Sequence, residues 1–263
     1  MTEAAGDLKI TAPLRLRRVG IDTYQEPVIY MREDCEVCLA EGFEAQSRVL
    51  VRHGGRHIVA TLNVVTSNWL ALDEAGLSEA AWRLLAAHEG EAVSIAHPPP
   101  LESMRYVRAK LHGNNLTDGE MQAVIADIAV GRYADIELAA FVSACAGTRL
   151  TAAETSAMTR AMIGVGEQLR WHRAPIVDKH CVGGLPGNRT TPIVVAIVAA
   201  YGLTIPKTSS RAITSPAGTA DAMEMLAPVD LDTRAMRAVV EREGGCVVWG
   251  GSVRLSPADD ILI

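Results

Sequence analysis

The sequence lacks an excess of basic residues, a signal-peptide pattern and a long hydrophobic run. Its 25 Lys and Arg residues face 31 Asp and Glu residues, giving a formal net charge of −6 at pH 7. That balance provides no basic surface of the kind that binds nucleic acids. The first seven residues show no basic stretch followed by an apolar one. The apolar run at residues 193–200 is far shorter than the roughly 20 residues of a membrane-spanning helix.

Cysteine is also scarce. The five cysteines are an odd number in a chain of 263 residues, which excludes a small disulfide-rich domain. Cys35 and Cys38 have no second pair and no histidine cluster nearby, so we interpret them as ordinary strand cysteines rather than a redox or zinc site. His53 and His57 surround a Gly-Gly turn and are expected to be exposed, not metal ligands. These features predict a soluble cytoplasmic protein with reduced thiols and no metal site.

The composition that is present is globular. Hydrophobic residues make up 49% of the chain and charged residues 21%, which excludes a disordered or collagen-like protein. At roughly 150 residues per domain, the length suggests about two domains. The pattern of apolar and polar residues along the chain, however, indicates three parts.

Residues 1–98 have the texture of a β-rich domain. Short runs with β-branched residues predict strands at residues 8–16, 28–30, 47–51, 57–65 and 92–96. One helix is predicted between Leu77 and Gly90. The part is expected to be a small barrel or sandwich, and the prolines at 98–100 are expected to form a stiff linker after it.

Residues 101–173 change to helical periodicity and predict a helical domain. Val124, Ile125, Ile128 and Ala129 share one helical face. Thr117 with Glu120, and Thr151 with Glu154, have the spacing of capping boxes. We predict four helices, joined by turns at Gly113, Gly131 and Gly147.

Residues 174–263 alternate between strands and helices. Strands are predicted at 176–181, 203–208 and 246–249, and helices at 192–201, 219–226 and 231–243. Such alternation predicts a mostly parallel sheet. The expected fold class is therefore a multi-domain α/β protein with a β-rich N-terminal domain, a helical domain and an incomplete α/β domain.

The first chemically distinctive loop is residues 178–191, DKHCVGGLPGNRTT. Its glycines allow close backbone approach to an anion, and Lys179 and the hydroxyls of Thr190 or Thr191 add a charge and donors. A plain glycine-rich turn, with Thr191 as the helix N-cap and Pro192 at the first helical position, is the structural alternative. A P-loop is excluded because it requires Gly and Lys where Asn188 and Arg189 stand.

The second loop is residues 206–219, PKTSSRAITSPAGT, in which six of 14 residues carry a hydroxyl and Lys207 and Arg211 are cationic. Both loops follow predicted strands of one sheet. Open α/β sheets bind ligands at the carboxyl ends of their strands. Together the loops predict a site for phosphate and sugar oxygens.

These two loops, with residues 249–251 and 256–260, closely resemble the thymidine phosphorylase/AMP phosphorylase family from about Leu101 onward. The first hundred residues look like the extra N-terminal domain of its longer branch. The resemblance implies a pentosyltransferase in which inorganic phosphate attacks C1′ and displaces the base. It implies no organic cofactor, with phosphate as co-substrate, and a homodimer through helical faces such as residues 139–146.

The resemblance also implies the site residues. His180 and Lys179 would be catalytic, with His180 beside the sugar or base. Asp178 is interpreted as a carboxylate that orients the loop, and Trp171 and Trp249 as core or interface residues. Phosphate would be held by Lys179, Thr190, Thr191, Ser209 and Thr219. The substrate pocket would include Gly184, Ser210, Arg211, Ala212, Ile213, Thr214, Ser215 and Thr219.

Two points of the implied site stay open. Cys181 stands where shorter family members often have a phosphate-binding serine, and a thiol could instead be a packing residue. Arg211, Thr214 and Ser215 favour a 5′-phosphorylated substrate, which gives adenine and ribose 1,5-bisphosphate from AMP. The usual label of such bacterial sequences favours thymidine, which gives thymine and 2-deoxyribose 1-phosphate.

The end of the chain predicts that a second half is missing. Ser256 and Pro257 begin a helix that stops at Ile263, and few strands are available for the sheet. Family members are roughly twice as long, and their general-acid aspartate would lie beyond Ile263. The alternative of another class is therefore a truncated, non-catalytic module for phosphate or nucleotide binding or for assembly.

Overall fold

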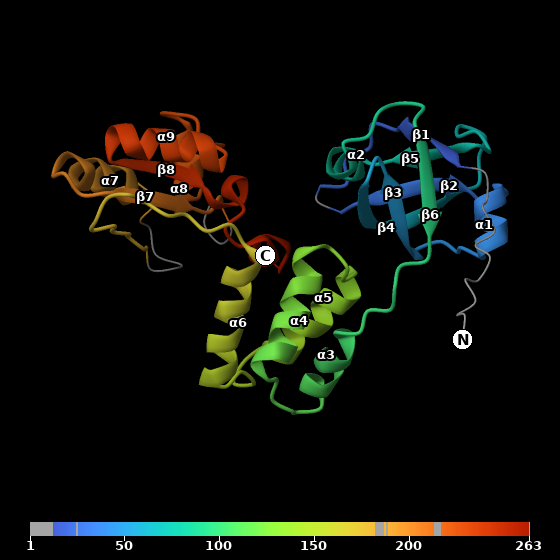
Figure 1. The fold of residues 1–263 in the computed structure, drawn as a ribbon, viewed down its shortest axis with the longest axis horizontal. Helices are drawn as coiled ribbons and strands as arrows, with labels where there is room; N and C mark the ends of the chain where they lie inside the picture. Colours follow the sequence, from blue (N-terminus) through green and yellow to red (C-terminus); the bar gives the residue numbers. More distant parts are fainter. Residues whose placement is uncertain (1–12, 25, 182–186, 188, 213–216, 263) are drawn as a thin grey trace, which may run out of the picture. The chain divides into compact units, whose positions relative to one another are not determined.

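The computed structural model describes residues 13–24, 26–181, 187, 189–212 and 217–262. In the described part of the N-terminal segment, the strands close into a barrel with the order β1-β5-β2-β4-β3-β6 (Figure 1). β1 pairs in parallel with β5 and β2 with β4, whereas β3 is antiparallel to both β4 and β6. The strands are β1 (Leu14–Arg18), β2 (Val28–Arg32), β3 (Arg48–His53), β4 (Arg56–Val65), β5 (Glu74–Leu77) and β6 (Ala92–Ala96).

The barrel core comes from alternating residues of these strands. Leu14 and Leu16 of β1 are buried while Arg15 between them is exposed, as expected for side chains that alternate across a strand. Ile29, Met31 and Leu62 are fully buried in the same core. The predicted strands at 28–30, 47–51, 57–65 and 92–96 correspond to β2, β3, β4 and β6. Of the predicted strand at 8–16, residues 8–12 lie outside the described part.

Two elements of the barrel segment were not predicted. β5 is missed because its sequence, EAGL, has little β-propensity; it forms by pairing with β1 and β2. Helix α1 (Glu36–Glu41) replaces the predicted strand around the cysteines. Cys35 is its N-cap, with Sγ accepting a hydrogen bond from Cys38 N–H, and Gly42 ends it at φ 65°. The interpretation of Cys35 and Cys38 as strand cysteines is therefore wrong, although both are buried.

The predicted helix near residue 80 is α2 (Glu79–Leu85), capped by Ser78. Four further helices follow as predicted: α3 (Met104–Leu111), α4 (Asp118–Ala129), α5 (Asp135–Cys145) and α6 (Ala152–Val165). The capping box of Thr151 and Glu154 is formed at the start of α6. Gly113, Gly131 and Gly147 all have positive φ, at the turns between these helices.

The last segment contains a parallel pair of strands, β7 (Ile205–Ser209) and β8 (Gly245–Trp249). It also contains α7 (Thr190–Ala200), α8 (Thr219–Glu224), α9 (Thr233–Glu243), the short η1 (Gly250–Val253) and α10 (Pro257–Leu262). The predicted strand at 176–181 is reduced to one parallel bridge between Ile176 and Thr204.

Thr191 is also placed differently from its prediction as an N-cap. Helix α7 begins two residues earlier than predicted, at Thr190, and its N-cap Arg189 makes no side-chain cap. Thr191 therefore lies within the first turn and is fully buried. Its hydroxyl is consequently available to the loop before the helix.

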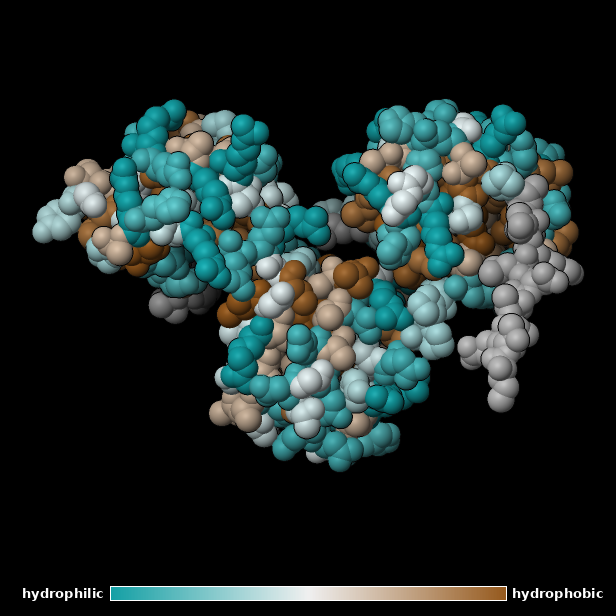
Figure 2. Space-filling view, viewed as in Figure 1, coloured by the Kyte–Doolittle hydropathy of each residue, from teal (hydrophilic) through white to brown (hydrophobic). Residues whose placement is uncertain are grey.

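The chain divides into two compact units, residues 1–108 with 130–143, and residues 109–129 with 144–263. The site residues described below belong to the second unit. Hydrophilic side chains cover much of the face in Figure 2, with hydrophobic side chains in scattered groups. No helix in the described ranges combines the length and apolar character needed to cross a bilayer. The domain boundaries expected from the sequence stay a prediction.

Candidate active site

The first loop brings an ammonium group, a thiol and a buried hydroxyl together. Lys179 Nζ donates to Thr191 Oγ1 at 3.0 Å and to Cys181 Sγ at 2.7 Å. Thr191 Oγ1 and Cys181 Sγ are 3.5 Å apart. An ammonium group has three donors, and residues in the described part of the chain engage two of those of Lys179. The cluster is therefore able to bind an oxyanion with a cation and a hydroxyl already in position.

Cys181 belongs to this cluster and is not a packing residue. The residue is exposed, and its thiol also lies 3.5 Å from the carbonyl oxygen of Gly187. The hydrogen bond from Lys179, followed by that with Thr191, lowers the pKa of the Cys181 thiol from its usual range. The packing alternative for this position is thus excluded, because the side chain contacts polar groups and solvent.

Asp178 joins the first loop to β7. Its Oδ2 atom lies 2.9 Å from His180 Nε2, and its Oδ1 atom lies 3.2 Å from Lys207 Nζ. The side chain of His180 is 86% exposed, whereas that of Lys207 is only 7% exposed. A buried cation thus fixes one edge of the carboxylate while the other edge holds the imidazole. This is the geometry of an orienting carboxylate.

The second loop is held against the start of α8 by Asp221. Asp221 Oδ2 accepts hydrogen bonds from Gly218 N at 2.8 Å and Ala212 N at 2.7 Å. The backbone bond from Gly218 is the largest cause of the lowered pKa of Asp221. A Cβ atom at Gly218 would lie 2.6 Å from the Ser210 carbonyl oxygen and 2.5 Å from the Arg211 carbonyl carbon. Only glycine therefore permits this approach of the two backbone segments.

Arg211 is paired with three carboxylates of its own segment. Its guanidinium lies 2.6 Å from Glu224 Oε2, 3.2 Å from Asp221 Oδ1 and 3.4 Å from Asp230 Oδ2. Hydrogen bonding to Glu224 is the largest cause of the raised pKa of Arg211. The same group lies 4.9 Å from the ring centroid of Trp249. The charge of Arg211 is thus compensated within the protein.

The other expected site residues lie at the ends of the neighbouring elements. Thr190 begins α7 and is exposed, Ser209 ends β7, and Thr219 begins α8. The Ser210 carbonyl accepts a hydrogen bond from Ala220 N at 3.3 Å. The structure thus brings Lys179, Cys181 and Thr191 together directly and links them through Asp178 to β7. Gly184, Ile213, Thr214 and Ser215 lie outside the described residues.

Lys207 and Asp221 are two residues of the site that the sequence reasoning did not assign. Lys207 carried a detectable signal, because in a strand it shares a face with Ile205, which is buried. A lysine on a buried face requires a nearby carboxylate, and Asp178 is the one it finds. Asp221 carried a weaker signal, the acidic residue expected in the first turn of a helix.

Comparisons with known proteins agree with this organisation. A family model described as "Glycosyl transferase family, helical bundle domain" matches residues 104–166. A second, described as "Glycosyl transferase family, a/b domain", matches residues 173–262. A solved anthranilate phosphoribosyltransferase (TrpD) from Thermus thermophilus is similar at 25% identity and a TM-score of 0.46. That similarity covers 59% of this chain and 47% of the other.

Curated relatives have a much higher sequence identity to this chain than that solved structure. "Putative thymidine phosphorylase" of Polaromonas sp. (strain JS666) is 68% identical over 95% of this chain and 49% of its own length. "Putative thymidine phosphorylase 2" of Acidovorax sp. (strain JS42) is 62% identical over all of this chain and 51% of its own length. The chain thus spans about half the length of the curated relatives it matches. With both domain models matched in order along it, the chain belongs to the glycosyl transferase family that combines this helical bundle with this α/β domain.

Proposed function

We propose that this chain supplies the phosphate-binding part of a pentosyltransferase that cleaves a nucleoside with inorganic phosphate. The observation that carries the proposal is the Lys179 ammonium group, held beside the Thr191 hydroxyl and the Cys181 thiol. The printed names of the similar relatives support the same reaction class. A cation beside a hydroxyl provides the charge-assisted hydrogen bonds that phosphate oxygens accept.

In the proposed reaction, a phosphate oxygen forms a bond to C1′ of the sugar as the bond from C1′ to the base nitrogen breaks. The electron pair of that bond leaves with the base. The base gains the proton that the hydrogen phosphate gives up on becoming an ester, and the products are the free base and a pentose 1-phosphate. Lys179 and Thr191 hold the phosphate for attack, and binding both reactants in one site supplies much of the rate. His180, which Asp178 contacts at 2.9 Å, is proposed to act beside the sugar or base.

A nucleoside is the preferred substrate, and thymidine is the one that the names of the relatives suggest. The case for a 5′-phosphorylated substrate such as AMP depended on a guanidinium available to a second phosphate. Arg211 is instead engaged by Glu224, Asp221 and Asp230. AMP phosphorolysis remains the second candidate because hydroxyl-bearing residues flank this arginine.

The remaining features of the proposed enzyme follow from the family resemblance. It needs no organic cofactor, with phosphate as co-substrate, and it works in the cytoplasm. It forms a homodimer through the helical segment. The apolar side chains that α5 exposes, Ile136 at 80% and Val142 at 47%, support such an interface.

The test combines binding with turnover. Titration calorimetry with inorganic phosphate is expected to show binding that Lys179→Ala weakens by roughly tenfold or more, because a charge-assisted hydrogen bond is lost. Arg234→Ala is the charge-matched control, since this exposed arginine lies on α9. Base release from thymidine and from AMP is then measured with and without phosphate.

Each outcome decides between the alternatives. Phosphate-dependent release from thymidine but not AMP supports the nucleoside reaction, and the reverse supports AMP phosphorolysis. Phosphate binding without any turnover supports a binding module instead of an enzyme. Equal binding by Lys179→Ala and Arg234→Ala would show that the assigned phosphate site is wrong.

A further inference from the structure

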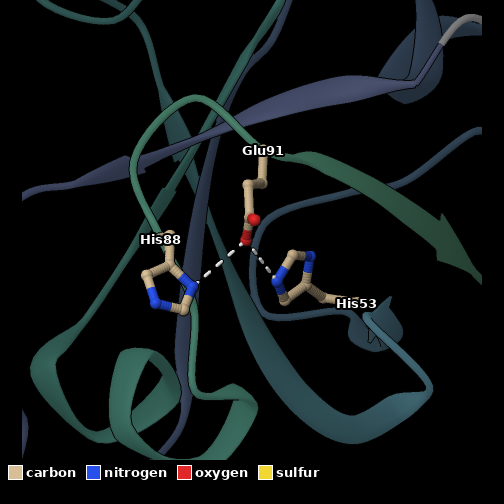
Figure 3. Close-up of side chains that lie close together, drawn as sticks. All are labelled: His53, His88 and Glu91. Carbon is tan, nitrogen blue, oxygen red and sulfur yellow. Dashed lines mark ion pairs between the residues drawn. The ribbon is translucent and has the colours of Figure 1, made fainter.

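Two histidines and a glutamate converge on one point of the barrel (Figure 3). Glu91 Oε2 lies 2.8 Å from His53 Nε2 and 3.3 Å from His88 Nδ1. The three potential ligand atoms all lie within 4.8 Å of one another. Neither family model reaches these residues, and the reaction proposed above does not use them.

The fold of the barrel creates this convergence. His53 is the last residue of β3, which pairs with β6 through Leu50, Val51 and Arg52. His88 and Glu91 belong to the turn that leads into β6, where Glu91 N donates to the His88 carbonyl at 3.4 Å. Gly90 allows that turn because its φ is +77°. Residues far apart in the sequence therefore meet at one end of the β3–β6 pair.

His53 is the most enclosed of the three side chains. It is only 10% exposed, so the expectation that His53 is an exposed residue beside the Gly-Gly turn is wrong, whereas His57 is exposed. Its Nδ1 atom lies 3.1 Å from the carbonyl oxygen of Ala92. A carbonyl can only accept, which assigns the hydrogen to Nδ1. Hydrogen bonding of one ring nitrogen to a carbonyl is how proteins orient a histidine that binds a metal through the other.

This assignment leaves the lone pair of His53 Nε2 facing a carboxylate oxygen at 2.8 Å. Two electron pairs at that distance repel each other unless a positive charge lies between or beside them. Either a second proton on the imidazole or a metal cation can provide it. His88 Nδ1 approaches the same oxygen at 3.3 Å, so a single metal cation placed among the three atoms would serve both imidazoles and the carboxylate.

The geometry points to a Zn²⁺ site formed by His53 Nε2, His88 Nδ1 and a carboxylate oxygen of Glu91. Zinc bonds to nitrogen and oxygen of about 2.0–2.1 Å place tetrahedral ligands roughly 3.3 Å apart. That spacing matches the 3.3 Å between Glu91 Oε2 and His88 Nδ1, whereas the 2.8 Å between Glu91 Oε2 and His53 Nε2 is shorter and has to widen when the ion binds. Imidazole nitrogens with one carboxylate are ligands that zinc prefers over magnesium or calcium. His88 is 78% exposed and Glu91 49% exposed, which leaves the fourth position open to water.

Zinc bound here would connect the end of β3 to the turn before β6. The ion would thereby stabilise the barrel, because a ligand that binds only the folded state shifts the folding equilibrium. This role does not depend on the proposed nucleoside reaction, so the zinc site can be tested separately from the substrate.

The test uses the tag-free chain in a Cys181→Ser background, which removes the exposed thiol as a competing ligand. After EDTA treatment and dialysis, calorimetric titration with ZnCl₂ is expected to show one site. His88→Ala is expected to weaken binding by roughly 100-fold, since one of three ligands is lost. His57→Ala is the matched control, because His57 is an exposed histidine of the same hairpin outside the cluster.

Two further measurements complete the test. Zinc is expected to raise the melting temperature of the parent and of His57→Ala, but not of His88→Ala or Glu91→Gln. In ¹⁵N spectra of the imidazole rings, zinc should shift the signals of His53 and His88 and leave His57 unchanged. The proposal is overturned if 1 mM ZnCl₂, on the order of 1,000 times a micromolar dissociation constant, produces no binding. It is equally overturned if His88→Ala binds zinc as well as His57→Ala, which would leave a protonated ion-pair cluster.

Discussion

Two lysine–carboxylate pairs in the second unit have the same chemical groups but differ in burial. Lys110 and Glu154 have side chains that are 3% and 1% exposed, with Nζ and Oε1 at 2.6 Å. Lys207 is similarly buried, at 7%, but its partner Asp178 is 50% exposed and the pair is 3.2 Å apart. One carboxylate is enclosed by protein, and the other faces solvent.

The partners of the two carboxylates differ as much as their burial. Glu154 accepts hydrogen bonds from Lys110, from Leu116 N and from both the N–H and hydroxyl of Thr151, and Lys110 also donates to the Arg149 carbonyl. Both side chains of that pair are shielded from solvent, at 3% and 1% exposed. Asp178 holds His180 and Lys207, and His180 remains 86% exposed. A closed and satisfied pair supports the fold, whereas an open one can position groups for a substrate.

The largest expected effect comes from breaking the closed pair. Glu154→Ala leaves the Lys110 ammonium buried without its counter-charge and should lower the free energy of unfolding by about 3–5 kcal/mol. Urea unfolding followed by circular dichroism measures the change. The double variant Lys110→Met/Glu154→Leu is the control, because removing both charges should restore most of the loss. A loss below about 1 kcal/mol for Glu154→Ala would mean that the pair behaves as an exposed one.

The closed pair should also respond to acid. Burial acts to raise the pKa of Glu154, but hydrogen bonds from Lys110, Leu116 and Thr151 outweigh it and hold the pKa at about 2, below the usual 4.5. Since the folded state has the lower pKa, the stabilisation is complete above about pH 5 and is lost as the pH falls toward 2. The loss amounts to about 3 kcal/mol.

Glu154→Gln isolates this contribution from those of other carboxylates. Urea unfolding between pH 6 and pH 3 should show a steeper fall in stability for the parent than for Glu154→Gln. Equal slopes for the two proteins would contradict the lowered pKa of this carboxyl.

Each region could be predicted from the sequence to the extent that its residues contact partners nearby in the sequence. The capping box of Thr151 and Glu154 joins residues three apart, so the start of α6 could be predicted from a short window. Strand β5 and the Asp178–Lys207 pair depend on partners far along the chain, and no local pattern contains them. The meeting of His53 with His88 has the same cause, since it needs the β3–β6 pairing first.

The site loops show a mixed outcome. Their glycines, lysine and hydroxyls are local and indicated an oxyanion site before any geometry was known. The partners of Arg211 could not be predicted, because a guanidinium is as suitable for a carboxylate as for a phosphate. Only the fold shows that Glu224 and Asp230 lie within reach. The oxyanion site inferred from composition therefore stays a prediction, whereas the pairing of Arg211 with carboxylates is visible only in the tertiary structure.

The smallest expected effect on stability comes from changing Lys179 in the exposed loop. This substitution should instead alter the reactivity of the Cys181 thiol. Lys179→Ala should alter the free energy of unfolding by no more than about 0.5 kcal/mol. It should slow alkylation of Cys181 by iodoacetamide at pH 7, because a smaller fraction of the thiol is then ionised. The reason is that the hydrogen bond from Lys179 is the largest cause of the lowered pKa of that thiol.

Mass spectrometry of peptides resolves this rate from those of the other cysteines. Burial raises the pKa of Cys145 to about 11 and that of Cys246 to about 12, so both should react far more slowly than Cys181 in every variant. Arg234→Ala should leave the Cys181 rate unchanged. If Lys179→Ala destabilised the chain as Glu154→Ala does, or left the Cys181 rate unaltered, the lysine would be a structural cation like Lys110. The contrast between the closed pair and the open site would then be lost.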